Sequence, residues 1–156
     1  MAPELSQRRP GKFELVVDAL DWGFRAQLDS YPTVDLASLS PPEAFREAAR
    51  RVDPCYVNPD AIIRQGGFTG EQPRAPELLD LVGERAVEHR MRLLLDVLTG
   101  LQERGHVRAD LDADTLTTMC FGGFFGAFLR GDPGGSAFAE RVGDTVWQLI
   151  ATDPGA

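Results

Sequence analysis

Apolar and small residues recur at helical spacing between positions 112 and 130, and this pattern is the clearest in the chain. At a period of about 3.6 residues, Thr115, Gly122 and Gly126 share one side of the predicted helix. The opposite side carries three aromatic rings: Phe121, Phe124 and Phe128. The strip without side-chain bulk would let another helix come close, whereas the rings would fill a core or line a cavity. A loop at Gly122-Gly123 is the alternative, but Asp112 is a good N-cap and favours the helix.

A second apolar pattern predicts a helix from Lys12 to Tyr31, which Pro32 would end. Its charged residues fall within one narrow strip, and the rest of its circumference is apolar or small. A helix of this kind is expected to be largely surrounded by protein. We therefore expect it to be the central helix of a bundle.

Proline, glycine and capping residues divide the rest of the chain into further helices. A serine followed by two prolines predicts a short helix over 41–51, and an Asn-Pro pair predicts another over 61–65, which a glycine pair would close. The longest predicted helix covers 76–104, with Gly105 as its left-handed cap. A last helix is predicted over 136–151.

These elements predict an all-α fold, an antiparallel bundle of about six helices. The sequence contains no convincing strand and no repeat at a fixed period. We expect a flexible arm over residues 1–11, which are mostly polar and contain prolines, and one helical domain over residues 12–152.

Composition narrows the possible functions. The chain has 156 residues, of which 43% are hydrophobic, enough for one domain with a good core. Its formal charge of −8 disfavours nucleic-acid binding, which depends largely on Lys and Arg. No apolar run reaches the roughly 18 residues of a membrane span, and the N-terminus lacks the apolar segment of a signal peptide. We therefore expect a cytoplasmic protein without membrane association, in which Cys55 and Cys120 remain thiols.

The sequence offers no group of residues that would support catalysis or metal binding. His89 and His106 lie far apart without a paired ligand motif, and neither a nucleophile motif nor a phosphate-binding loop is present. Asp110, Asp112 and Asp114 resemble the start of a calcium loop, but its glycine and closing glutamate are missing. Capping charge at a helix N-terminus is the better interpretation. We expect no catalytic residue, no metal and no cofactor.

A small-molecule pocket is the favoured kind of site. Arg90 projects from the apolar side of its predicted helix, and together with nearby aromatic residues it predicts a pocket for a mid-sized apolar or aromatic ligand, anionic if arginine anchors it. The candidate ligand-binding residues are Trp22, Phe24, His89, Arg90, Met91, Met119, Phe121, Phe124 and Phe128. The alternative is ordinary core packing in which Arg90 pairs with an acid such as Asp18 or Glu14. In both cases Arg90 faces the interior and balances a carboxylate.

The two C-terminal helices predict a two-fold symmetric homodimer. The glycine strip points away from the rings and is not needed for the protomer's own core, and the last helix carries a long apolar stripe with a tryptophan at its edge. The candidate interface residues are Thr115, Gly122, Gly126, Phe138, Val142, Val146, Trp147, Leu149 and Ile150. The alternative is a monomer in which the glycines admit a neighbouring helix of the same chain.

Two sequence motifs carry a family resemblance. The run LQERGHVRADLD at 101–112 closes the long helix and resembles the leucine-rich helix, "erG", basic residue and "DlD" of TetR-family transcriptional regulators. PGKFEL at 10–15 resembles the "P-S-K-x-x-L" at which the family's DNA-binding domain joins its regulatory domain. The order and lengths of the helices are also similar. From about Pro10 onward, the chain therefore resembles the ligand-binding and dimerisation domain of this family.

The resemblance implies an effector-binding domain that dimerises through its two C-terminal helices. The family's helix-turn-helix would lie upstream of Pro10, so we expect no DNA contact by this chain alone, and operator DNA only if such a motif precedes it. The alternative is a stand-alone helical sensor or interaction protein, or a small helical enzyme, with no role on DNA.

Overall fold

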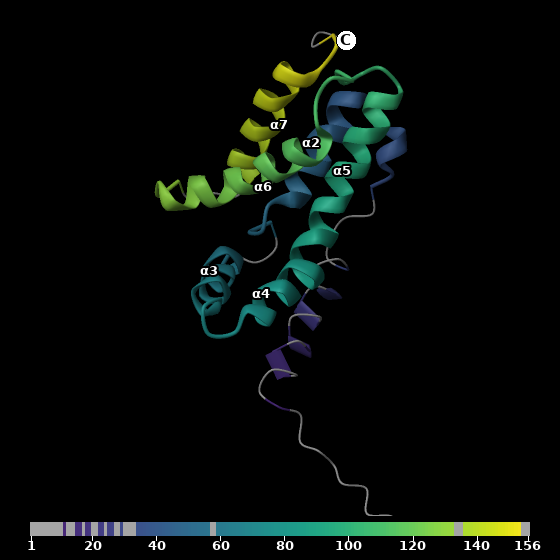
Figure 1. Cartoon of the computed structure of the whole chain (residues 1–156). Coiled ribbons are helices and arrows are strands. Elements are labelled where there is room, and N and C mark those ends of the chain that lie inside the picture. The colour runs from purple at the N-terminus through teal and green to yellow at the C-terminus, as the bar shows by residue number, and fades with distance from the viewer. Residues whose placement is uncertain are drawn as a thin grey trace, which may run out of the picture.

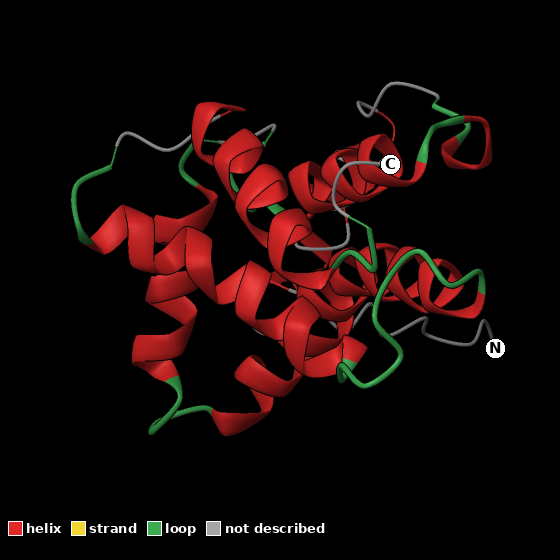
Figure 2. Cartoon of the chain, turned by 90° about the horizontal axis from the view of Figure 1, so that it is seen from above, coloured by secondary structure: helices red, strands yellow, loops and turns green. Residues whose placement is uncertain are grey.

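The structure is a computed structural model, and it describes residues 11, 15–16, 18–19, 22–23, 25–26, 29, 34–56, 59–132 and 136–153. Throughout these residues the chain consists of helices and loops without a strand, which confirms the predicted all-α class (Figure 2). One isolated antiparallel bridge joins Val107 to Ala151. Residues 1–10 of the predicted arm lie outside the described residues.

The described core begins with η1 (Leu36–Ser38), a single 3-10 turn, followed by α2 (Pro41–Val52). α2 starts where the sequence predicted. The Glu43 carboxylate reaches back and accepts hydrogen bonds from the Ser40 backbone N–H at 3.1 Å and from its hydroxyl at 2.6 Å. These bonds satisfy a backbone donor at the helix start, where no intrahelical partner exists.

α3 (Ala61–Glu71) is longer than predicted, because the glycine pair Gly66-Gly67 does not close it. Glycine favours a helix end where the backbone turns left-handed. Among the described residues only Gly105 and Gly131 do so. At the glycine pair the backbone stays helical, and the irregular connection begins after Glu71.

The next three elements run on without interruption: α4 (Pro76–Val82), η2 (Gly83–Val87) and α5 (Glu88–Glu103). The extent of the long predicted helix is thereby confirmed, although its middle segment, η2, is π-helical and was not predicted. Gly105 follows the end of α5, and its φ of 76° confirms the predicted left-handed cap. The His106 N–H donates to the Leu101 carbonyl at 2.9 Å across this turn.

α6 (Ala113–Leu129) and α7 (Ser136–Ile150) complete the described fold. Asp112 caps α6 by accepting hydrogen bonds from the backbone N–H groups of Asp114 at 3.0 Å and Thr115 at 3.2 Å. α6 continues through Gly122 and Gly123, so the alternative of a loop at these positions is wrong. In Figure 1 the last turns of α6 extend beyond the start of α7.

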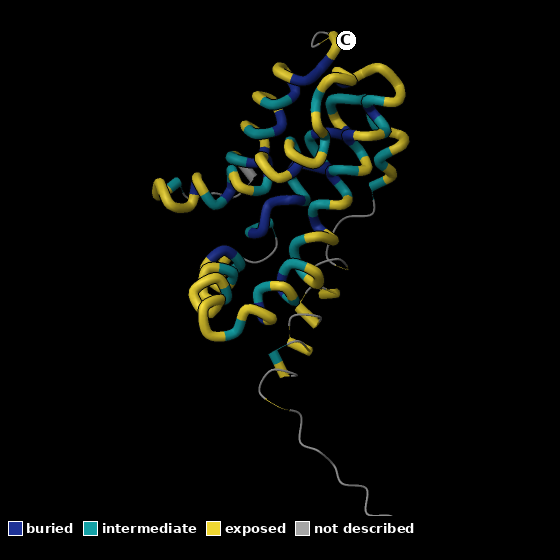
Figure 3. Tube along the Cα trace, viewed as in Figure 1, coloured by how far each residue is buried: buried dark blue, intermediate teal, exposed yellow. Residues whose placement is uncertain are grey.

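α2 packs against both α5 and α7, and most of the core lies where these three helices meet (Figures 1 and 3). Phe45 on α2 is 0% exposed, and its ring centroid lies 5.8 Å from that of Trp147 on α7. The largest fully buried side chains are those of Phe45, Leu94, Leu98, Leu101, Val52, Val107, Thr117 and Pro54.

The predicted helix over 12–31 is helical at its described positions, but they are not surrounded by protein. Leu15 and Trp22 expose 55% and 75% of their surface, and only Val16 is half-buried. The prediction of a central helix is therefore wrong at these residues. Its apolar circumference indicated that other helices would surround it. In the described core, however, the helix at the centre is α2.

α7 lies close against α2 at Gly143. A Cβ added there would lie 3.0 Å from Arg46 Cγ and 3.3 Å from Arg46 Cα on α2. These separations are tighter than ordinary van der Waals contact, so a side chain at this position would require Arg46 and the adjoining part of α2 to shift.

Gly143→Leu is expected to lower the free energy of unfolding by about 1–3 kcal/mol, because the new side chain must displace the α2 backbone. Gly100→Leu is the matched control, since Gly100 is also helical but has open space around its Cβ position. Urea denaturation of both variants checks this. Equal stability of the two would show that α2 and α7 are not in close contact.

Candidate functional site

One side of α6 forms an open face, which we define by Thr115, Met119, Gly122, Gly126 and Leu129. All five residues are exposed, Met119 by 67% and Leu129 by 83%. A Cβ added at Gly122 or Gly126 would meet no atom of the described structure within 4 Å. In Figure 3 exposed residues extend along α6 to its far end. The glycine strip is therefore not filled by a neighbouring helix from the described part of the same chain.

The opposite side of α6 packs into the core. Thr117, Cys120, Phe124 and Ala127 are buried. The Phe124 ring meets that of Phe138 on α7 edge to face, with 5.5 Å between centroids. Of the three rings predicted on this side, Phe124 is buried and Phe121 is half-buried, whereas Phe128 is exposed.

α7 has one side that is buried in the core, and beside it runs an apolar strip that is only partly covered. The strip consists of four predicted interface residues, of which the first three are half-buried and the last is exposed: Phe138, Val142, Val146 and Leu149. Trp147 and Ile150 were predicted to face a partner, but they are only 2% and 3% exposed. Both belong to the protomer's own core, because the small residues Ala139 and Gly143 bring this side of α7 against the rest of the bundle.

The described candidates for ligand binding differ in their burial. Arg90 and Phe124 are buried. The others are half-buried or exposed: Met91, Phe121, Trp22, His89, Met119 and Phe128. Phe24 lies outside the described residues.

Arg90 is buried as predicted, and its positive charge acts on the buried carboxylate of Asp53, in the loop after α2. Arg90 is 7% exposed and Asp53 is 2% exposed. Burial raises the pKa of Asp53, while a 2.8 Å hydrogen bond from the Cys55 N–H and the positive charge of Arg90 act in the opposite direction. The expected interior position of Arg90 is therefore confirmed, and its pairing with a carboxylate stays a prediction. Of the two partners suggested by sequence, Asp18 is exposed and Glu14 lies outside the described residues.

Both cysteines are free thiols. Burial raises the pKa of the Cys120 thiol to about 11, so the group is protonated at neutral pH. Burial also raises the pKa of Cys55, whose thiol donates a 3.3 Å hydrogen bond to the Pro59 carbonyl. Neither environment favours the thiolate that a nucleophilic cysteine needs.

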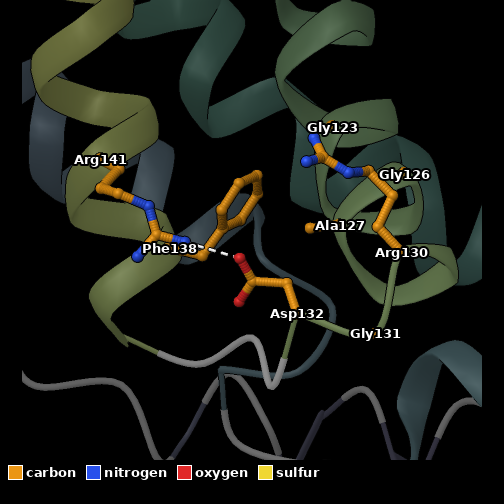
Figure 4. Close-up of a pocket in the computed structure, with 8 residues that line it drawn as sticks. All are labelled: Gly123, Gly126, Ala127, Arg130, Gly131, Asp132, Phe138 and Arg141. Atoms are coloured by element: carbon orange, nitrogen blue, oxygen red, sulfur yellow. Dashed lines mark hydrogen bonds and ion pairs between the residues drawn. The ribbon is translucent and has the colours of Figure 1, made fainter.

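A cavity of about 580 Å³ lies between the C-terminal half of α6 and the first turns of α7 (Figure 4). Arg141 donates a hydrogen bond to Asp132 at 2.7 Å, and its guanidinium lies 5.3 Å from the centre of the Phe138 ring. The described lining residues include two of the predicted interface residues and none of the described ligand-binding candidates: Gly123, Gly126, Ala127, Arg130, Gly131, Asp132, Phe138 and Arg141.

The sequence did contain a signal for part of this cavity. Gly131 ends α6 with φ 75°, and the Asp132 N–H donates to the Ala127 carbonyl at 3.0 Å. This is the same left-handed helix end that was recognised at Gly105. From this signal, Arg130 and Asp132 could have been placed together at the end of α6. Arg141 and Asp53 carried no comparable local signal.

In the part of the chain that the structure describes, no three His, Cys, Asp or Glu side chains are grouped so as to hold a metal ion. No helix of the described residues combines the length and the apolar character needed to cross a membrane. No protein-family model, curated protein or solved structure matches the chain.

Proposed function

We propose that this chain is an effector-binding and dimerisation domain of the kind found in TetR-type transcriptional regulators, and that it is not an enzyme. In this proposal α6 and α7 of two protomers form a four-helix bundle about a two-fold axis. The ligand is a small apolar or aromatic molecule that can carry a negative charge. The motifs at 10–15 and 101–112 and the all-helical described residues support this assignment.

The observation that carries the proposal is the incomplete cover of α6. Beyond its first turns this helix is almost entirely apolar, yet only one of its sides is buried. A helix that is apolar all round is normally covered all round, because exposed apolar surface is unfavourable in water. The open face of α6 therefore requires a cover that the described residues do not provide.

A second copy of the chain fits this face in both charge and shape. The open face contains no charged side chain, so two protomers with a net charge of −8 each can meet there without opposing charges at the centre. The two glycines near its middle leave room for the backbone of another helix. Pairing of identical faces closes the assembly as a dimer.

Gly122→Leu is expected to convert the dimer to a monomer without unfolding the protomer, since the leucine enters open space in the protomer but blocks the partner helix. Light scattering at micromolar concentration should give twice the chain mass of 17.1 kDa for the wild type and 17.1 kDa for the variant. Gly100→Leu makes the same substitution in α5, away from the open face, and should remain dimeric. A wild-type mass of 17.1 kDa would end the dimer proposal.

A further inference from the structure

The geometry points to the cavity between α6 and α7 as a binding site for a small aromatic carboxylate, with Arg130 as the residue that binds its charge. This inference rests on the proposed effector-binding function and specifies its site and ligand class. It places the anionic group at Arg130 rather than at Arg90, because Arg90 is buried and already lies near the Asp53 carboxylate.

The charges around the cavity leave one guanidinium for a ligand. Asp132 is engaged by Arg141 through a 2.7 Å ion pair. Arg130 is exposed at the end of α6 and has no side-chain partner among the described residues. Two arginines and one aspartate are among the described lining residues, which therefore carry a net charge of +1 in a chain whose overall charge is −8. A carboxylate would complete this charge balance by pairing with Arg130 through charge-assisted hydrogen bonds.

The remaining walls suit a flat apolar group. Gly123, Gly126 and Ala127 contribute almost no side-chain bulk, while Phe138 presents an aromatic ring. In Figure 4 Arg130 comes from the α6 side and Arg141 from the α7 side, with the ring of Phe138 between them in this view. The volume of about 580 Å³ is that of a small-molecule site, in a pocket that is partly open to solvent. A planar ring beside Phe138 could therefore direct its carboxylate toward Arg130.

Benzoate is the probe, and benzamide is its neutral counterpart of nearly the same shape. Binding of each to the full chain is followed by NMR titration of the backbone amides of Gly123, Gly126 and Gly131. Benzoate should give saturable shifts at these glycines, and benzamide should bind at least ~10-fold more weakly because it lacks the charge that Arg130 recognises.

Arg130→Gln should weaken benzoate binding by at least ~10-fold. Arg104→Gln is the matched control: Arg104 is also the last residue before a left-handed glycine at a helix end, but it lies at the end of α5 and outside the cavity. It should bind benzoate like the wild type. Absence of saturable shifts in the wild type, or equal weakening in both variants, would overturn the inference.

Light scattering on the same samples separates this inference from the proposed dimer. A monomeric chain that binds benzoate through Arg130 would refute the dimer and retain the site. A dimer that does not bind benzoate would refute the site and retain the dimer. If benzoate bound only to the monomeric Gly122→Leu variant, an acidic side chain of the second copy would be the occupant of the cavity, and the small-molecule site would be rejected.

Discussion

Phe45→Ala is expected to lower the free energy of unfolding by about 3–5 kcal/mol. Phe45 is fully buried on α2, and its ring packs against that of Trp147. Its removal loses the transfer free energy of a buried aromatic ring and leaves a cavity that rigid helices on both sides can only partly fill. A loss of this size is a large fraction of the stability of a small domain.

Phe128→Ala provides the matched control for Phe45→Ala. Phe128 is 41% exposed, so the same change of side chain should cost much less stability. Urea denaturation of both variants and the wild type, at one protein concentration and with unchanged m-values, measures the difference. Comparable losses at the two positions would contradict the placement of α2 at the centre of the core.

Arg90→Met is expected to destabilise the fold by about 3–5 kcal/mol, because it removes the positive charge near a carboxylate that stays buried. Asp53 is 2% exposed, and the charge of Arg90 is one of two influences that lower its pKa against the effect of burial. Arg92→Met, an exposed position on the same helix, should change stability by no more than about 0.5 kcal/mol.

The cost of Arg90→Met should depend on pH in a defined direction. Burial already raises the pKa of Asp53 in the folded protein, and loss of Arg90 raises it further. Between the unfolded-state and folded-state pKa values the folded protein binds more protons, so its stability falls as pH rises through this window. The deficit of the variant relative to wild type should therefore be smallest in acid and grow toward neutral pH.

A second substitution identifies the carboxylate concerned. Asp53→Asn in the Arg90→Met background removes the buried charge, so it should recover part of the lost stability at neutral pH and remove most of the pH dependence. Denaturation curves across the acidic range would test both effects. A deficit that is independent of pH and unchanged by Asp53→Asn would mean that Arg90 stabilises the fold through packing alone.

The sequence by itself determined most helix boundaries in the described residues. Ser40, Asp112 and Gly105 were recognised because a cap acts on backbone groups only a few residues away along the chain, so its partners are close in sequence. The failure at Gly66-Gly67 has the same origin: glycine permits a left-handed turn without requiring one. Local geometry also predicted that the glycines and Phe124 would lie on opposite faces of α6.

Only the tertiary structure decided which surfaces meet. Apolar periodicity shows that a helix needs cover, but the choice of neighbour depends on how the shapes of two distant segments fit together. Small residues at one side of α7 allow it to approach α2 at Gly143, and Trp147 is buried as a result, whereas the equally bare strip at Gly122 remains open. For the same reason Arg90 lies near Asp53, a residue from another segment that no local pattern could connect to it.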